Sequence, residues 1–214
     1  MCFSANASFG AGIVLSVIGV ISLKKVQTPS QIIFASIPLI FAVQQITEGF
    51  LWLSFSNPAF SSIHIFTTYL FLFFAQVVWP VWVPLSIYKL EKNEQRKKGQ
   101  KILLGIGTIV SVYLGYCLMV YNVEAKIIGY HISYEQDYPA FLSLYGGALY
   151  VISTIAPPLA SSIKKMWIVG SAILISYIVT TIFYEDYIVS VWCFFASIIS
   201  LLVYGMMRRI APQK

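Results

Sequence analysis

The stretch ILLGIGTIVSVYLGYCLMVY, residues 102–121, contains no charged side chain and directly follows the charged stretch EKNEQRKKGQK at residues 91–101. A helix of roughly 20 mostly apolar residues is long enough to cross the hydrocarbon core of a bilayer. The apolar run is continuous rather than alternating, which favours a helix over a barrel strand. This stretch therefore predicts an integral membrane protein.

The overall composition agrees with that interpretation. The 214 residues are 58% hydrophobic and only 10% charged, whereas about a quarter of the residues of a soluble domain are charged. So few charges cannot cover a soluble surface, and they also argue against nucleic acid as a partner in spite of the net charge of +6. The lipid bilayer is the expected partner. An aromatic content of 16% excludes disorder.

Seven segments of this kind lie between charged and turn residues, and they predict an all-α fold. We expect a single integral-membrane domain over residues 1–214, folded as a seven-transmembrane-helix bundle. The last two segments are separated only by Glu185 and Asp186 and should form a tight antiparallel pair. The segments are residues 8–23, 31–55, 62–88, 102–121, 140–159, 166–184 and 187–207.

The positions of Lys and Arg predict the orientation. Thirteen of the fourteen lie at residues 24–25, 89–101, 164–165 and 208–214, which seven crossings place on one side, and only Lys126 lies on the other. Positive charges concentrate in cytoplasmic loops, so the N-terminus is expected outside and the C-terminus in the cytoplasm of a multi-pass plasma membrane protein. No basic residue precedes the first segment, which favours a retained helix over a cleaved signal peptide.

Polar side chains interrupt the second segment, which reads PLIFAVQQITEGFLW at residues 38–52. On a helix, Gln44, Gln45, Glu48 and Trp52 share an arc of about 100°. An ionised carboxylate at this depth costs roughly 3 kcal/mol. We therefore expect Glu48 to face the bundle interior, where it is protonated, hydrogen-bonded or beside a cation. The stripe is interpreted either as a ligand site or as a set of hydrogen bonds between helices.

The third segment contains QVVWPVWVP at residues 76–84. Pro80 cannot donate a hydrogen bond to the carbonyl of Gln76, so the sequence predicts a kink. Gln76 lies near the midpoint of its segment, level with the two glutamines of the second segment. A freed carbonyl beside three amides would form a polar site like those in the broken helices of transporters. Trp79 and Trp82 are expected in the cytoplasmic aromatic belt.

The loop at residues 122–139 is the only long loop on the predicted outer side. Apolar or aromatic residues alternate in it with polar ones, a pattern that favours a short extended or hairpin element. Such an element could lie over the bundle mouth as a lid with its apolar face toward the helices. The apolar members of the pattern are Ile128, Tyr130, Ile132 and Tyr134.

A metal site is a further hypothesis for the outer side. His64, His131, Glu48 and Cys2 supply the ligand types of a site for zinc or another transition metal. Their spacing matches no recognised metal-binding motif, and loop histidines are more often solvated than ligating. The other two cysteines, Cys117 and Cys193, fall within membrane segments, so the three thiols do not indicate a disulfide framework.

Two stretches carry a resemblance to a known family. The opening MCFSANASF at residues 1–9 and the stretch QQITEGFLW at residues 44–52 resemble an uncharacterised family of small bacterial multi-pass membrane proteins, which share an MCFSA-type start and a QQxxEGxxW stretch. The resemblance is specific over about the first 55 residues. It implies a bacterial inner membrane origin and assigns no activity.

The favoured function is that of a small-ligand-binding membrane protein, a proton- or cation-coupled transporter with an outward-facing polar pocket. The pocket would consist of Gln44, Gln45, Glu48, Trp52 and Gln76, with Glu48 as the proton or cation partner. Small sugar and amino-acid transporters with three plus one plus three spans resemble this chain in topology, and parallel repeats are a known transporter plan.

Two other functions are consistent with the same residues. A membrane-embedded hydrolase acting on lipid or a small amphiphile would use Glu48 as base or ligand and His64 and His131 at a metal. A non-catalytic accessory subunit would need the polar stripe only for helix packing. Glu48 is the one charged residue inside a predicted segment, so each of these hypotheses gives it a central place.

Overall fold

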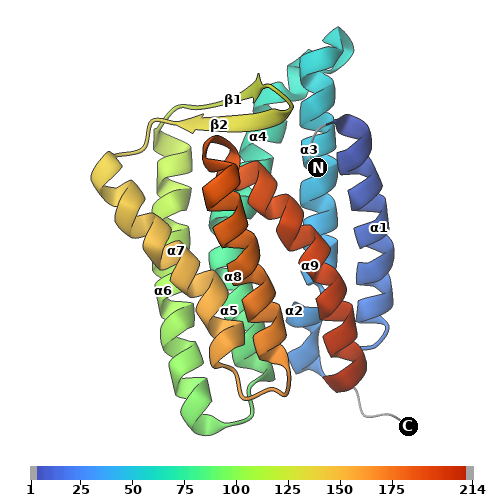
Figure 1. Ribbon diagram of the computed structural model, residues 1–214, viewed down its shortest axis with the longest axis vertical. Coiled ribbons are helices and arrows are strands. Elements are labelled where there is room, and N and C mark those ends of the chain that lie inside the picture. The colour runs from blue at the N-terminus through green and yellow to red at the C-terminus, as the bar shows by residue number, and fades with distance from the viewer. Residues whose placement is uncertain (1–3, 211–214) are drawn as a thin grey trace.

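The computed structural model describes residues 4–210, apart from the side chains of residues 140–145 and 196. It is a bundle of long helices with a two-stranded hairpin across one end (Figure 1). Within the described part of the chain, six helical segments are long and apolar enough to cross a membrane. They are Ala5–Leu23, Pro29–Ser56, Pro58–Leu90, Glu94–Val120, Met166–Phe183 and Glu185–Ile210.

The helices and strands follow the seven predicted segments and the loop between the fourth and fifth of them. In chain order they are α1 (Ala5–Leu23), η1 (Pro29–Gln31), α2 (Ile32–Ala35), α3 (Ile37–Ser56), η2 (Pro58–Ile63), α4 (His64–Leu72), η3 (Phe73–Val78), α5 (Trp79–Leu90), α6 (Glu94–Val120), β1 (Val123–Ile128), β2 (His131–Gln136), α7 (Ala140–Ala160), α8 (Met166–Phe183), η4 (Glu185–Tyr187) and α9 (Ile188–Ile210).

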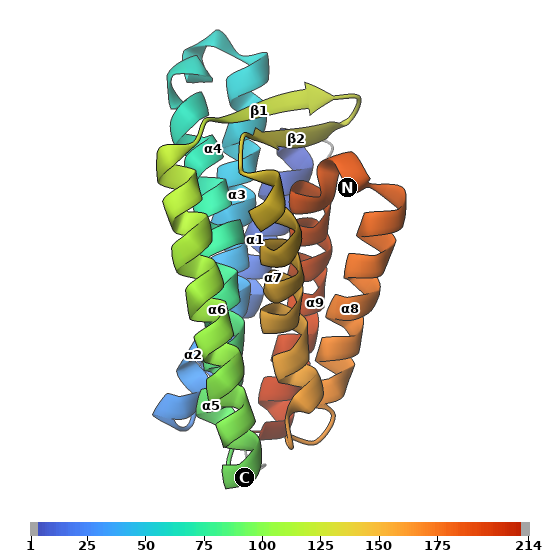
Figure 2. The same cartoon turned by 90° about the vertical axis from the view of Figure 1, so that its left-hand side faces the viewer.

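Helix α7 corresponds to the fifth predicted segment. It packs against α6 on one side and α8 on the other, and it runs through the bundle between the hairpin and the opposite end (Figure 2). Its apolar stretch over described side chains, Gly146–Ala160, is shorter than the six segments above.

Two helix boundaries differ from those that the sequence predicts. Helix α6 begins at Glu94 rather than at residue 102, because the side chain of Asn93 accepts a hydrogen bond from the backbone N–H of Arg96 at 3.0 Å and caps the charged turn. The second predicted segment is two helices, α2 and α3, that meet at Ser36. Pro38 has no N–H with which to continue the hydrogen bonding of α2.

The disturbance predicted at Pro80 appears as the π-helical segment η3, which ends two residues before that proline. A π-helical turn contains an extra residue and leaves backbone carbonyls available to other donors. The carbonyl of Ala75 accepts a hydrogen bond from the hydroxyl of Tyr150 at 2.5 Å, and that of Val77 accepts one from Ser111 at 2.7 Å. Neighbouring helices α7 and α6 thus satisfy the π-helical backbone.

The loop between α6 and α7 forms an antiparallel hairpin in which Ile128 pairs with His131. Gly129 begins its two-residue turn with φ of 61°, in the left-handed region that favours glycine. Ile132 and the short Ala125 are buried against the end of α3. The ring of Tyr134 stacks on Phe71 at a centroid distance of 5.0 Å. Ile132 and Tyr134 of the predicted apolar face thus pack against the bundle, whereas Ile128 and Tyr130 at the turn are 43% and 78% exposed.

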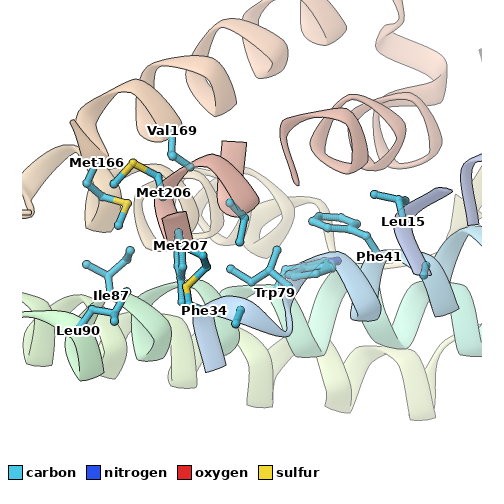
Figure 3. Packing of buried hydrophobic residues seen from close by; sticks show 14 residues of the cluster. Leu15, Phe34, Phe41, Trp79, Ile87, Leu90, Met166, Val169, Met206 and Met207 are labelled. Atoms are coloured by element: carbon cyan, nitrogen blue, oxygen red, sulfur yellow. The ribbon is translucent and has the colours of Figure 1, made fainter. Parts of the chain in front are cut away.

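The main hydrophobic core lies in the half of the bundle away from the hairpin. Methionines from α8 and α9 pack there against aromatic and aliphatic side chains of α2, α3 and α5 (Figure 3). The loops that carry the basic clusters, and the end of α9, lie together at this end of the molecule (Figure 1). We call the two ends of the bundle the hairpin end and the basic end.

Candidate functional site

The five residues predicted to form a polar pocket are all buried. Gln44, Gln45 and Glu48 are 0% exposed, Gln76 is 7% exposed and Trp52 is 8% exposed. Their hydrogen-bond partners differ, however, so the structure distributes them over several environments rather than gathering them around one space.

Gln44 connects three helices. Its Nε2 donates to Sγ of Cys193 on α9 at 3.2 Å, and its Oε1 accepts from Nε1 of Trp79 on α5 at 2.8 Å. The Trp79 ring also stacks on Phe41 at a centroid distance of 3.8 Å. The prediction that Trp79 belongs to an aromatic belt is wrong, because its ring is buried and its N–H is used inside the bundle.

Glu48 is held against α9. The hydroxyl of Ser190 donates to Glu48 Oε1 at 2.6 Å, so the carboxyl group faces the bundle interior and not lipid. With the contacts of Gln44, this bond fastens α3 to α9. Both residues therefore make the hydrogen bonds between helices that a packing role requires.

Gln45 and Trp52 differ from their neighbours on the stripe. Within the described part of the chain, neither amide atom of Gln45 nor Nε1 of Trp52 has a hydrogen-bond partner, although all three atoms are buried. Nearly all buried polar groups in proteins are paired. These two side chains are thus the members of the predicted pocket for which protein contacts do not account.

Gln76 points to the hairpin end rather than to the other glutamines. Its Nε2 donates to Oε1 of Gln136 at 2.8 Å, and its Oε1 accepts from the hydroxyl of Tyr138 at 3.0 Å. Burial raises the pKa of Tyr138, which keeps the phenol neutral and able to donate. The π-helical segment is thereby tied to the end of β2 and to the linker that follows it.

A cavity of about 280 Å³ lies next to this amide pair. It is bounded by the π-helical segment, by α6 to α9 and by the end of the hairpin. The described side chains that line it include no Lys, Arg, His, Asp or Glu. Its polar and aromatic lining residues are Gln76, Gln136, Tyr113, Tyr138, Tyr150, Tyr177 and Trp192.

Trp192 holds the aromatic part of this lining in place. Its Nε1 donates to the hydroxyl of Ser176 at 3.2 Å. The rings of Tyr150 and Tyr177 meet it edge-on at centroid distances of 5.6 and 5.1 Å. A concave space with a largely apolar and aromatic wall and a few fixed polar groups is the usual form of a small-molecule site.

The residues of the metal hypothesis lie in separate surroundings. His64 exchanges a hydrogen bond of 2.9 Å with the hydroxyl of Ser54, whereas the ring of His131 stacks on Tyr187 at 4.6 Å. Burial lowers the pKa of His131. Among the described residues, no group of three His, Cys, Asp or Glu side chains could hold a metal ion. Cys2 lies outside the described residues.

The outward side of the hairpin carries charges. The Lys126 ammonium lies 2.7 Å from Glu135 and 3.1 Å from Glu124, and the hydrogen bond that it donates to Glu135 is the main reason why the pKa of Lys126 is raised. The one basic residue of the hairpin is therefore matched by two acidic ones.

The sequence contained some signals for the additional residues of the cavity. Cys193 was already notable as a thiol within a membrane segment, and Gln136 and Tyr138 flank the predicted extended element. Trp192 and Tyr150 carried no such signal, because single aromatic residues are ordinary in membrane helices. Their shared position follows from two contacts of the folded chain, the hydrogen bond from Tyr150 to the Ala75 carbonyl and the edge-on contact of Tyr150 with Trp192.

These features define a polytopic α-helical membrane protein with a hairpin across one end and an aromatic cavity beneath it. The family profile described as "Family of unknown function (DUF6629)" matches residues 1–214. The chain belongs to that family. Neither the curated proteins nor the solved structures gave a significant match.

Proposed function

We propose that this protein is an integral membrane protein that binds a small ligand in the cavity beneath the hairpin. The observation that supports the proposal is the aromatic lining around the Gln76–Gln136 amide pair. Such a wall suits a ligand with an apolar or aromatic body, and the amides suit one or two hydrogen-bonding groups on it. Because no described side chain of the lining is charged, a strongly anionic ligand is a poor fit.

In this proposal Glu48 does not line the cavity but contacts α9, one of the helices that do. Its partner Ser190 precedes Cys193 by one helical turn, and Cys193 is part of the lining. Protonation of Glu48 would therefore act on the ligand through α9. We further propose that the protein transports this ligand together with a proton or cation that binds at Glu48. The polar stripe would then lie next to the ligand without touching it.

Filling the cavity should abolish binding. A Cβ atom at Gly146 would lie 3.5 Å from the Tyr113 ring, an ordinary contact, so the larger side chain of Gly146→Leu is expected to occupy the space beside that ring. We expect the amount of small molecule that co-purifies with the protein to be at least about tenfold lower in this variant than in the wild type. A tenfold change corresponds to a loss of roughly 1.4 kcal/mol of binding free energy. Mass spectrometry of the compounds released on denaturation measures this.

The matched control is Gly105→Leu on α6, where an added Cβ meets open space and which does not line the cavity. It should retain the bound compounds. Once a compound is identified, titration at two pH values with Glu48→Gln tests the coupling, and equal pH dependence in both proteins would remove Glu48 from it. If the wild type carries no more bound compound than Gly146→Leu, the cavity is not a ligand site.

We also propose seven crossings with the N-terminus outside the plasma membrane, which in a bacterium is the inner membrane. Helix α7 has 21 residues, and at 1.5 Å per residue it is about 31 Å long, enough to serve as the seventh crossing. The support for the orientation is the gathering of basic residues at one end, since such residues favour the cytoplasmic side.

Labelling of single cysteines tests this topology. In a Cys2→Ser background, Tyr130→Cys in the hairpin turn and Lys98→Cys at the basic end both place a thiol on an exposed position. A membrane-impermeant maleimide should label Tyr130→Cys in intact cells and Lys98→Cys only after lysis. The reverse order would invert the orientation, and labelling of both in intact cells would contradict the single crossing, helix α6, that separates the two positions.

A further inference from the structure

We propose that the basic end contains a second binding site, which takes a phosphate group. A cavity of about 540 Å³ lies there, at the opposite end of the bundle from the hairpin. Among the described residues that line it, four are cations, Lys92, Lys164, Lys165 and Arg209, and none is an acid. The phosphate can belong to an anionic lipid headgroup or to a free phosphate compound, and both present the same chemistry to these side chains.

The cations come from three separate parts of the chain. Lys92 follows α5, the two other lysines precede α8, and Arg209 lies in the last turn of α9. The preference for positive charge on the cytoplasmic side asks only that basic residues lie at this end. That preference does not require basic residues from three distant segments to line the same cavity. Leu90 and Ile210 add apolar surface to the lining.

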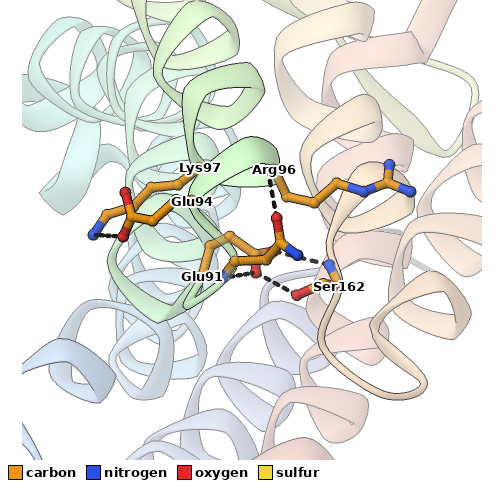
Figure 4. A network of polar contacts seen from close by, with 6 residues as sticks. Glu91, Glu94, Arg96, Lys97 and Ser162 are labelled. Atoms are coloured by element: carbon orange, nitrogen blue, oxygen red, sulfur yellow. Dashed lines mark hydrogen bonds and ion pairs between the residues drawn. The ribbon is translucent and has the colours of Figure 1, made fainter.

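An acidic residue, Glu91, adjoins Lys92 in sequence but does not line the cavity. Its carboxylate accepts hydrogen bonds from the loop between α7 and α8 (Figure 4). Its Oε2 accepts from the backbone N–H of Ser162 at 2.8 Å, and the hydroxyl of Ser162 donates to its Oε1. The backbone N–H of Asn93 also donates to Oε1, at 3.0 Å. These bonds fix the loop that presents the two lysines.

The backbone of Lys165 supports a role for its side chain. It is the one non-glycine residue in the described chain with positive φ, at 68°. Glycine would adopt this conformation without the steric cost that a Cβ brings. Lys165 also occupies the N-cap position of the 18-residue helix α8, and its side chain makes no capping hydrogen bond there. The N–H groups of that turn therefore add positive potential beside the cavity.

Binding of short-chain phosphatidylglycerol to the purified full-length protein in neutral detergent tests the proposal. Phosphatidylcholine of the same chain length is the zwitterionic comparison. We expect phosphatidylglycerol to bind more tightly than phosphatidylcholine. The double variant Lys164→Gln/Arg209→Gln should weaken phosphatidylglycerol binding about 25-fold, because each basic residue at a phosphate contributes roughly a factor of five. Native mass spectrometry measures the bound lipid.

The matched control removes two charges from the same end but outside the cavity. Lys25→Gln/Lys98→Gln changes exposed residues that do not line it, and this variant should bind as the wild type does. Lys165→Gly separates binding from folding. We expect its melting temperature to be equal or higher, because glycine relieves the positive φ, while its affinity falls about fivefold.

Calorimetry with inorganic phosphate identifies the source of the group. Binding of inorganic phosphate that is lost in Lys164→Gln/Arg209→Gln indicates a free phosphate compound. Phosphatidylglycerol binding that inorganic phosphate does not displace indicates a lipid headgroup. The proposal is overturned if the control pair loses as much affinity as the cavity pair, or if phosphatidylglycerol binds no better than phosphatidylcholine and inorganic phosphate does not bind.

Discussion

Gly107→Ala should lower the free energy of unfolding by about 3 kcal/mol, at the upper end of what overpacking usually costs. A Cβ atom at Gly107 would lie 1.8 Å from the carbonyl oxygen of Pro80, a distance that no rotation of a side chain can relieve because the contact is with backbone. Helices α5 and α6 would have to separate. The hydrogen bond of 2.7 Å from Ser111 to the Val77 carbonyl would lengthen with them.

Gly105→Ala, two residues earlier on the same helix, is the control. An added Cβ meets open space there, so alanine should stabilise the helix by roughly 0.5–1 kcal/mol relative to glycine. Thermal or SDS-induced unfolding of the purified proteins in the same detergent measures both. Equal effects of the two substitutions would show that the close approach of α6 to Pro80 does not hold in solution.

Glu91→Ala is expected to destabilise the protein by about 3 kcal/mol, the scale for a buried hydrogen-bonded charge. Glu91 is 2% exposed and joins the end of α5 to the loop before α8. Its removal leaves the backbone N–H of Ser162 and two hydroxyls without their acceptor. Glu91→Gln keeps the shape of the side chain and should cost less than alanine does.

The same carboxylate predicts how stability depends on pH. Burial raises the pKa of Glu91, but the hydrogen bonds from Ser162, Asn93 and Ser161 outweigh burial, and the net pKa lies below its usual value. The folded protein thus binds fewer protons here than the unfolded chain. The stabilisation is complete above the unfolded pKa, about 4.3, and is lost as the pH falls through the lower folded value.

Unfolding measured as a function of pH separates Glu91 from its neighbour Glu94. Glu91→Gln should remove part of the acid sensitivity of the wild type, because no proton can be taken up at that position. Glu94 is 81% exposed and pairs with Lys97 at 3.6 Å, so Glu94→Gln should change stability by less than about 0.5 kcal/mol and leave the pH profile intact. Parallel profiles for wild type and Glu91→Gln would refute this account.

The sequence predicted the membrane helices well because length and lack of charge are local properties. It also placed Glu48 on an arc that faces the interior. The arc of one helix does not reveal which helix lies opposite, so Ser190, 142 residues further on, could not be named as the partner. The alternation in residues 128–135 likewise indicated a hairpin, but not that Gln136 would bind Gln76.

Trp79 shows where a local argument fails. The expectation of an aromatic belt rested on its position toward the predicted cytoplasmic end of the third segment, beside the kink expected at Pro80. The π-helical segment before it contains an extra residue, and one residue rotates all later side chains by about 100°. That rotation turns the Trp79 ring toward Phe41 and Gln44. The helical pattern alone contains no sign of where such a residue is inserted.

The contacts of the hairpin also bear on the order in which parts of the protein can fold during synthesis. Ser133 donates to the backbone carbonyl of Asp186 at 3.1 Å, and His131 stacks on Tyr187. Both partners are synthesised about 50 residues after the hairpin itself. Since the chain emerges from its N-terminus onward, strands β1 and β2 are synthesised before α8 and before these partners. The contacts between the hairpin and residues 185–187 can therefore form only after the turn into α9 has been synthesised.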